Sequence, residues 1–196
     1  MSTNLQDTWP EFIEVTTGRP PWPLLERAAA LHERPGKALD FGAGAGRDTL
    51  FLLEKGWTVD SVDSEPRSAE VLAKLPHQER LGHQISRFDE FEFGGYDLVN
   101  AQFTLPFNPS STFNAMFTRL RASLLPGATL SCVFFGPHDE WNTPERDMSF
   151  HDEAQIRELC SGLDILELAE SEEDGQTALL TPKHWHVFRL LARRPP

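Results

Sequence analysis

Three glycines at alternating positions, with an acid further along the chain, are the residues best placed to do chemistry. Gly42, Gly44 and Gly46 follow the apolar run KALDF (37–41), and Asp63 ends the next apolar run. Glycines let the backbone turn sharply and let a ligand lie against bare peptide groups. An acid about 20 residues further on can accept hydrogen bonds from both hydroxyls of a ribose. The pattern therefore predicts a nucleoside-binding site.

Asp40, two residues before the first glycine, indicates which nucleoside to expect. The dinucleotide motif G-x-G-x-x-G would need a glycine at position 47, where the sequence has Arg47. An acid at position 40 would repel a pyrophosphate but attract an ammonium group. A cationic nucleoside with an amino-acid tail suits both Asp40 and Asp63, and S-adenosylmethionine has that chemistry. A second interpretation of Asp40, a bond to backbone N–H groups of the glycine turn, stays open.

Alternating strands and helices must position these residues. The expected strands are 37–41, 57–63, 82–88, 96–103, 128–136, 164–171 and 184–194. We predict an α/β, Rossmann-like fold with a seven-stranded, mostly parallel sheet and helices on both faces. No helix is expected between the last two strands, which predicts a C-terminal antiparallel hairpin. Ligands of such sheets bind beyond the C-terminal strand ends, where the strand order reverses.

The expected helices follow from apolar spacing and capping residues. They are 23–33, 47–56, 64–75, 110–124 and 149–163. Ser64 is the expected N-cap of the third helix, and Ser110 or Ser111 that of the fourth. Ser149 and Asp152 are expected to form a capping box before the fifth. The acidic run 170–174 is expected to be a solvated turn.

Composition narrows the class of protein. The 196 residues form one expected domain, with residues 1–22 as an N-terminal arm or lid. The formal charge of −12 argues against a nucleic-acid partner, because lysine and arginine supply most of that affinity. No signal-peptide pattern and no membrane-spanning run is found, so a cytoplasmic protein without a membrane partner is expected. We expect a monomer or weak homodimer. Cys132 is expected to be an unreactive residue of the hydrophobic core.

Four segments together resemble class I S-adenosylmethionine-dependent methyltransferases. They are LDFGAGAGR (39–47), VDSVDSEP (59–66), YDLVNAQFTLPF (96–107) and LLPGATLSCVFFG (124–136). The resemblance covers about residues 20–193, and the chain is most similar to small single-domain enzymes of the tellurite- or thiopurine-methylating kind. It implies methyl transfer from S-adenosylmethionine to a small-molecule nucleophile, with S-adenosylhomocysteine as product.

The resemblance also implies roles for the matching residues. Gly42 and Gly44, with Ala43 between them, would line the methionine part of the cofactor. Asp40 would lie near its amino group, and Asp63 would hold the ribose hydroxyls. The remaining implied cofactor contacts are Ser64, Arg87 and Phe88 around the adenine, with Asp89 as an alternative acid, and Ala101, Gln102 and Phe103 near the methionine or the reacting methyl.

Two arginines are candidates for the cofactor carboxylate, because a guanidinium pairs with it through two hydrogen bonds. They are Arg19, in TGRPP, and Arg47. For each, the alternative is a surface arginine, and we favour that alternative for Arg47.

The loop FFGPHDEW (134–141) should overhang the cleft, because it follows the fifth strand. His138 and Asp139 are therefore the candidate catalytic residues, with a solvated loop as the alternative. His184 and His186 share one face of the last strand and could bind a metal, but the sequence offers no evident third ligand, so no metal is expected.

Two other functions remain open. One is a non-catalytic S-adenosylmethionine-binding module that regulates a partner. The other is a nicotinamide-dependent oxidoreductase, against which Arg47 counts.

Overall fold

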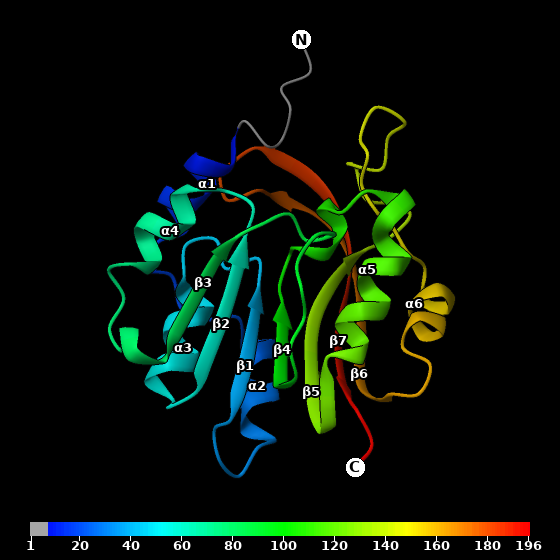
Figure 1. Cartoon of the computed structure of the whole chain (residues 1–196). Coiled ribbons are helices and arrows are strands. Elements are labelled where there is room, and N and C mark those ends of the chain that lie inside the picture. Colours follow the sequence, from blue (N-terminus) through cyan, green and yellow to red (C-terminus); the bar gives the residue numbers. More distant parts are fainter. Residues whose placement is uncertain (1–7) are drawn as a thin grey trace.

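The computed structural model describes residues 8–196 (Figure 1). Its elements in chain order are α1 (Trp9–Thr16), α2 (Pro23–Ala30), β1 (Lys37–Phe41), α3 (Arg47–Glu54), β2 (Thr58–Asp63), α4 (Arg67–Leu72), η2 (Gln78–Arg80), β3 (Leu81–Ile85), β4 (Tyr96–Ala101), η3 (Leu105–Phe107), α5 (Ser110–Ala122), β5 (Leu124–Phe135), α6 (Glu153–Leu159), β6 (Asp164–Gln176) and β7 (Pro182–Arg193).

The strands form one seven-stranded sheet in the order β3-β2-β1-β4-β5-β7-β6. Neighbouring strands from β3 to β5 pair in parallel, whereas β7 is antiparallel to both β5 and β6. The predicted fold class and C-terminal hairpin are therefore confirmed. The chain moves outward from β1 through β2 to β3 and then returns to β4 on the other side of β1. The order thus reverses between β1 and β4.

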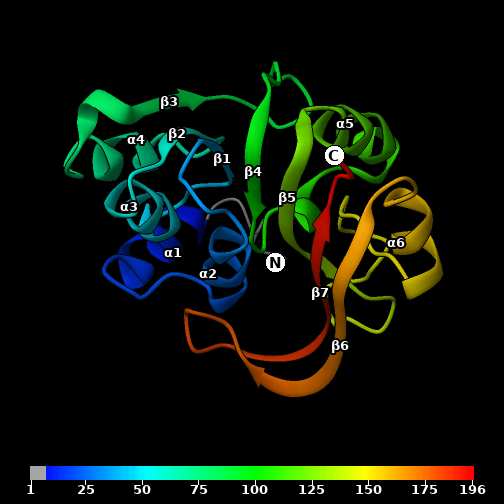
Figure 2. The same ribbon diagram turned by 90° about the horizontal axis from the view of Figure 1, so that it is seen from below.

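Helices cover both faces of the sheet, as predicted (Figures 1 and 2). Leu24 and Leu25 of α2 and Leu52 of α3 pack against one face in a buried apolar cluster. Phe113 of α5 and Ile156 of α6 belong to the larger cluster on the other face. Within residues 8–196, we find no helix with the length and apolar character needed to cross a bilayer.

Three predicted helix caps are wrong. Helix α4 begins at Arg67 rather than after Ser64, and neither α4 nor α5 has a side-chain cap. The capping box lies one turn later than predicted: Asp152, not Ser149, accepts from the backbone N–H of Gln155, and the Gln155 side chain accepts from the Asp152 N–H. Sequence spacing allowed both boxes, and the buried Ser149 hydroxyl instead donates to the Asn108 carbonyl.

The C-terminal hairpin is longer than predicted. Residues 170–174, expected as a solvated turn, belong to β6 and pair with β7 in register, with Glu172 opposite His186 and Asp174 opposite His184. Strand β5 likewise starts at Leu124, which was expected to end a helix. The far end of the hairpin arches over the C-terminal ends of the parallel strands toward α1 (Figure 1).

Candidate functional site

A cavity of about 550 Å³ lies over the C-terminal ends of the parallel strands. It is lined by the segments that follow β1, β2 and β4, by α1, and by the far end of the β6–β7 hairpin. The reversal of strand order between β1 and β4 places the cavity where ligands bind in open α/β sheets. The predicted arm 1–22 lies partly outside the described residues, and its described part supplies Trp9, Phe12 and Arg19 to the lining.

The glycine turn after β1 forms one wall. Gly42 has a φ of 90°, and a Cβ there would lie 2.0 Å from Oγ1 of the buried Thr104. Gly46, with a φ of 71°, is the N-cap from which α3 starts at Arg47. Only glycine adopts such conformations freely, and only a residue without a side chain fits against Thr104. The turn therefore presents bare backbone to the cavity.

Asp63 fastens the end of β2 to this turn. Its Oδ2 accepts from the Gly44 N–H and its Oδ1 from the Glu65 N–H, each at 2.8 Å. Burial raises the pKa of this carboxyl, and the two N–H groups oppose that shift. A carboxylate has about four lone-pair positions, so two remain for a ligand.

Asp40 and Asp48 share a buried network beneath the turn. Asn100 Nδ2 donates to Asp40 Oδ1 at 3.0 Å and to Asp48 Oδ2 at 2.9 Å. The Thr49 hydroxyl also donates to Asp40. Burial, followed by repulsion from Asp48, raises the pKa of Asp40 to about 7. Two buried acids close together, of which only Asp48 has an ion pair, make this end of the cavity suited to a positive group.

Arg47 lies beside these acids. Its guanidinium stacks 4.0 Å from the centre of the Trp22 ring, and its Nε is 3.8 Å from Asp48 Oδ1. Burial lowers the pKa of Arg47, with Asp48 opposing. Within the described residues, the buried Nη2 has no hydrogen-bond partner. A cavity-lining cation with a free donor is suited to a carboxylate.

The other end of the cavity is aromatic. Phe103 and Phe107 approach from the segment after β4, Phe135 from the end of β5, Trp141 from the loop that follows, and Trp185 from β7. Neighbouring ring centres in this aromatic wall are 5.7–6.1 Å apart. The Phe103 ring also lies 4.7 Å from Trp22, so the wall continues to the polar end.

A buried ion pair supports the wall from behind. Lys183 Nζ contacts the Asp139 carboxylate, and the two side chains are 1% and 0% exposed. The ammonium lies 4.0 Å from the centre of the Trp185 ring and 4.5 Å from that of Trp141. Burial lowers the pKa of Lys183, and Asp139 opposes the shift. This arrangement holds the aromatic rings in place.

Comparison with known proteins gives a family. The family model described as tellurite resistance protein TehB matches residues 26–133, which is more than half of the chain.

The chain belongs to the TehB family.

Solved structures agree on the fold of this TehB-family chain. The TehB structure from Haemophilus influenzae has a TM-score of 0.74 and 19% identity, with 87% of this chain and 61% of that chain covered. The present chain thus spans less than two thirds of that protein. A 1,6-didemethyltoxoflavin-N1-methyltransferase from Burkholderia thailandensis, solved with S-adenosylhomocysteine, has a TM-score of 0.72 and 19% identity, covering 98% and 86% of the two chains.

A third similar structure is the N-methyltransferase NodS from Bradyrhizobium japonicum, in complex with S-adenosylhomocysteine. Its TM-score is 0.66 at 17% identity, with 97% of this chain and 100% of that chain covered. Comparison with curated protein sequences gives no significant match. The resemblance to class I methyltransferases is therefore confirmed for the fold.

The cavity of the TehB-family chain brings together most, but not all, of the predicted cofactor residues. Those that line it are Arg19, Gly42, Ala43, Gly44, Asp63, Ser64, Phe88 and Gln102. Asp40 and Ala101 are buried outside the lining. Arg87 is exposed and donates to Asp89 Oδ1 and Oδ2, each at 3.1 Å, so neither of these two residues lines the cavity.

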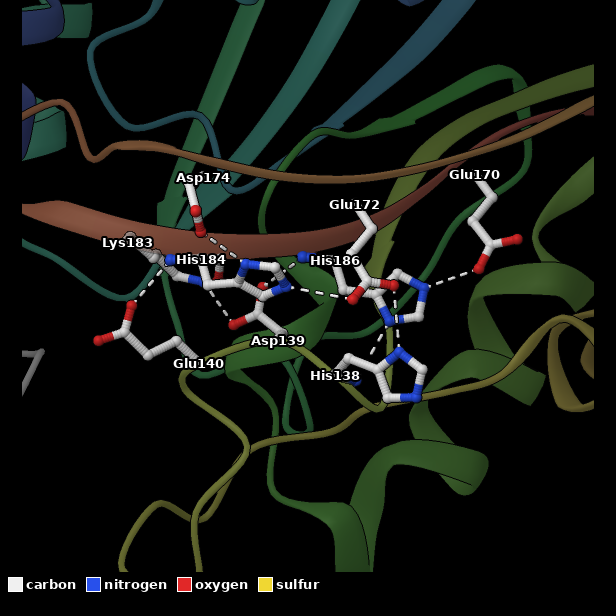
Figure 3. Close-up of polar contacts among 9 residues, drawn as sticks. All are labelled: His138, Asp139, Glu140, Glu170, Glu172, Asp174, Lys183, His184 and His186. Carbon is white, nitrogen blue, oxygen red and sulfur yellow. Dashed lines mark hydrogen bonds and ion pairs between the residues drawn. The ribbon is translucent and has the colours of Figure 1, made fainter.

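The two predicted catalytic residues also lie outside the lining. Asp139 is enclosed with Lys183 because its loop folds back under the aromatic wall. His138 Nδ1 lies 3.1 Å from Glu172 Oε2 on the outer side of the hairpin (Figure 3). A loop that follows a strand at the cleft edge need not point its polar side chains inward.

Sequence reasoning underrated or missed several lining residues. Arg47 is a candidate for which a surface position is the favoured prediction, yet it is half buried against Trp22. Asp48 and Thr104 were not singled out, although both line the cavity. The predicted start of a helix at Arg47 could have indicated Arg47 and Asp48, since the first turn of that helix must face the ligand. Only the fold brings Thr104 against Gly42.

Proposed function

We propose that this chain transfers the methyl group of S-adenosylmethionine to a small-molecule nucleophile. The observation that carries the proposal is the meeting of Gly42, Gly44 and Asp63 with an aromatic wall in one cavity at the reversal of strand order. Membership of the TehB family and the S-adenosylhomocysteine bound in two similar structures support it. S-adenosylmethionine is thus the proposed cofactor and S-adenosylhomocysteine the product.

The residues at the polar end fit the chemistry of that cofactor. Arg47 offers its unpartnered Nη2 to the carboxylate of the methionine part. Asp48, in contact with Asn100 and close to Asp40, supplies negative charge for the ammonium group. Asp63 has lone pairs left for the ribose hydroxyls. Ser64 and Phe88 are the proposed neighbours of the adenine, in keeping with the roles that the resemblance implies.

The aromatic end is the proposed place of the acceptor. When bound, S-adenosylmethionine supplies a methyl group that the positive sulfonium already activates. The task of Phe103, Trp141 and Trp185 is to hold the acceptor in line with that methyl and to exclude water. Because His138 and Asp139 lie outside the lining, we now propose an acceptor that needs no general base, such as a thiol, a selenol or a tellurite-like anion.

The other two functions gain no support. A purely regulatory module needs room for the nucleoside alone, whereas this cavity extends from the glycine turn to the aromatic wall. An oxidoreductase would bind a pyrophosphate at the turn, where Asp48 and the Asp40 network carry buried negative charge.

Calorimetric titration with S-adenosylmethionine tests the proposal. We expect Asp63→Ala to weaken binding by at least about tenfold, since it removes hydrogen bonds to a charged acceptor. Asp89→Ala, outside the cavity, is the matched control and should bind as the native chain does. Circular dichroism checks that both variants fold. Failure of the native chain to bind the cofactor, or equal binding by Asp63→Ala, would contradict the site.

Methyl transfer itself is tested with a radiolabelled methyl group and a panel of thiol, selenol and tellurite acceptors. We expect Trp185→Phe to keep cofactor binding and to change the KM for the acceptor, since Trp185 lines the aromatic end. Cofactor binding without transfer to any member of the panel would favour a non-catalytic module.

A further inference from the structure

Three potential metal ligands meet on the outer side of the C-terminal hairpin. His138 comes from the loop after β5, Glu172 from β6 and His186 from β7 (Figure 3). Each offers one ligand atom, and these atoms all lie within 4.8 Å of one another. The sequence indicated only His184 and His186 as a pair, because β6 was expected to end at Ser171, one residue before Glu172.

The cluster is separate from the cavity. Side chains alternate along a strand, so Trp185 reaches the cavity while His184 and His186 face the other way. Glu172 and His138 are likewise absent from the lining of the cavity. Whatever this cluster binds, it does not contact the reacting groups of the proposed transfer, and the inference is independent of that proposal.

His186 is oriented as metal-binding histidines are. Its Nε2 lies 2.8 Å from Glu170 Oε1, and its Nδ1 accepts from the backbone N–H of His138 at 3.1 Å. This pattern assigns the proton to Nε2 and leaves the Nδ1 lone pair facing His138. Metal-bound histidines commonly donate their other N–H to a carboxylate in this way.

Glu172 lies between two imidazoles. Its Oε2 is 3.1 Å from His138 Nδ1, and its Oε1 is 3.2 Å from His184 Nε2. Asp174 in turn holds His184 through Nδ1 at 2.7 Å. With zinc bonds of about 2.0–2.1 Å, two ligand atoms of a tetrahedral site lie about 3.3 Å apart. The His138–Glu172 separation is already close to that value.

We propose that His138, Glu172 and His186 bind a zinc ion. Two imidazoles and one carboxylate are a known zinc ligand set, with water as the fourth ligand. Binding replaces the proton-mediated His138–Glu172 contact with two metal bonds. His186 Nδ1 gives up the hydrogen bond that it accepts from the His138 backbone N–H and forms the third metal bond. The outer carboxylate of Glu170 keeps His186 in place.

The ion would fasten the loop after β5 to both strands of the hairpin. Asp139, adjacent to His138, holds Lys183 under the aromatic wall, and the His186 N–H donates to Asp139 Oδ2 at 3.3 Å. Zinc therefore stabilises the part of the chain that carries Trp141 and Trp185. Because the ion binds the folded form, it raises the melting temperature.

Titration of the chelator-treated full chain with zinc chloride tests the proposal. We expect one strongly bound equivalent, and a loss of affinity of at least about tenfold in both His138→Ala and Glu172→Gln. These side chains are 67% and 42% exposed, so neither change should impair folding, which melting curves without zinc will check. Glu170→Gln should weaken binding about 10–100-fold without removing a ligand.

His77→Asn is the matched control. His77 also faces a glutamate, with its Nδ1 3.8 Å from Glu79 Oε1, but this pair has no third ligand among the described residues. Asparagine tolerates the φ of 62° at this position. The control should bind zinc as the native chain does, and the native chain should show the visible absorption of tetrahedral cobalt(II) when cobalt replaces zinc.

Several outcomes would overturn the proposal. One is a native chain that takes up no zinc, and another is unchanged zinc binding in both His138→Ala and Glu172→Gln. A loss confined to one of the two variants would refute the three-ligand site, and an equal loss in His77→Asn would indicate scattered surface binding. In each case the cluster is a hydrogen-bonded network only.

Discussion

Two buried aspartates, one at each end of the cavity, show how differently its halves are built. Asp40, at the polar end, is held by the Asn100 amide and the Thr49 hydroxyl, and burial raises its pKa to about 7. Asp139, behind the aromatic end, is paired with the ammonium of Lys183. Within the described residues Asp40 forms no ion pair, and the nearest guanidinium, that of Arg47, pairs with Asp48 instead, whereas Asp139 has its own cation in Lys183.

The difference indicates which kind of ligand each end of the cavity can bind. Uncompensated buried negative charge costs free energy that a cationic ligand can recover. The polar end is therefore prepared for a positively charged group. At the aromatic end the charge is already neutralised, so the rings face the cavity with no unpaired charge behind them. That end suits a polarisable or apolar molecule.

The test with the largest expected effect removes the cation that pairs with Asp139, Lys183. Lys183→Met should lower the free energy of unfolding by about 3–5 kcal/mol, because Asp139 is left buried without a partner. Denaturant titration measures the change. Lys37→Met is the control: Lys37 pairs with Asp60 at 2.7 Å and lies over the Tyr96 ring, but the pair is 44% and 34% exposed and should cost less than about 1 kcal/mol.

Adding Asp139→Asn to Lys183→Met sharpens this test. The double variant no longer buries an unpaired charge, so it should regain part of the stability that Lys183→Met loses. Similar losses for Lys183→Met and Lys37→Met would show that the buried pair does not support the aromatic wall.

A second test concerns the backbone at the polar end. Gly42→Ala places a Cβ 2.0 Å from Thr104 Oγ1, whereas a Cβ at Gly127 would meet nothing within 4 Å. Gly42 has a φ of 90° and Gly127 a φ of 80°, so the backbone strain of an alanine should be similar in the two variants. Gly42→Ala should therefore lose about 1–3 kcal/mol more stability than Gly127→Ala, from overpacking alone.

Cofactor titration of the same two variants separates binding from stability. Gly42→Ala should bind S-adenosylmethionine more weakly, and Gly127→Ala should bind it normally. Equal losses of stability in the two variants would mean that Thr104 moves aside, and that the close fit at Gly42 is unimportant.

A third test concerns how the free energy of unfolding changes with pH. The pKa of Asp40 is about 7 in the folded chain and near 3.8 when unfolded, so between these values the folded form keeps a proton that the unfolded form has lost. The free energy of unfolding should thus fall as pH rises through that window. Asp40→Asn keeps an acceptor oxygen but cannot ionise, so it should flatten the dependence of the unfolding free energy on pH between about pH 4 and about pH 7.

Urea titrations of the native chain and Asp40→Asn at several pH values measure this slope. Identical slopes would mean that Asp40 is ionised in the folded chain over the whole range. The contrast with the paired Asp139 would then lose its basis.

The parallel half of the fold was readable from the sequence because its information is local. The run KALDF, the glycine turn and the strand ending at Asp63 lie within 27 consecutive residues, Lys37–Asp63. In a parallel sheet such neighbours meet at the same edge, so their convergence follows from order alone. Boundaries such as Leu124 and caps such as Ser149 were less certain, since spacing allowed more than one choice.

What the sequence by itself determined is the class of fold, the strand ends that form the cleft, and the glycine turn with its distant acid. Only the tertiary structure decided which polar side chains face that cleft. The register of β6 against β7 brings Glu172 to His186, and the loop after β5 turns Asp139 toward Lys183 and His138 outward. The contacts of the loop join residues 34–48 positions apart, and the antiparallel pairing of the strands, not local spacing, sets all of these contacts.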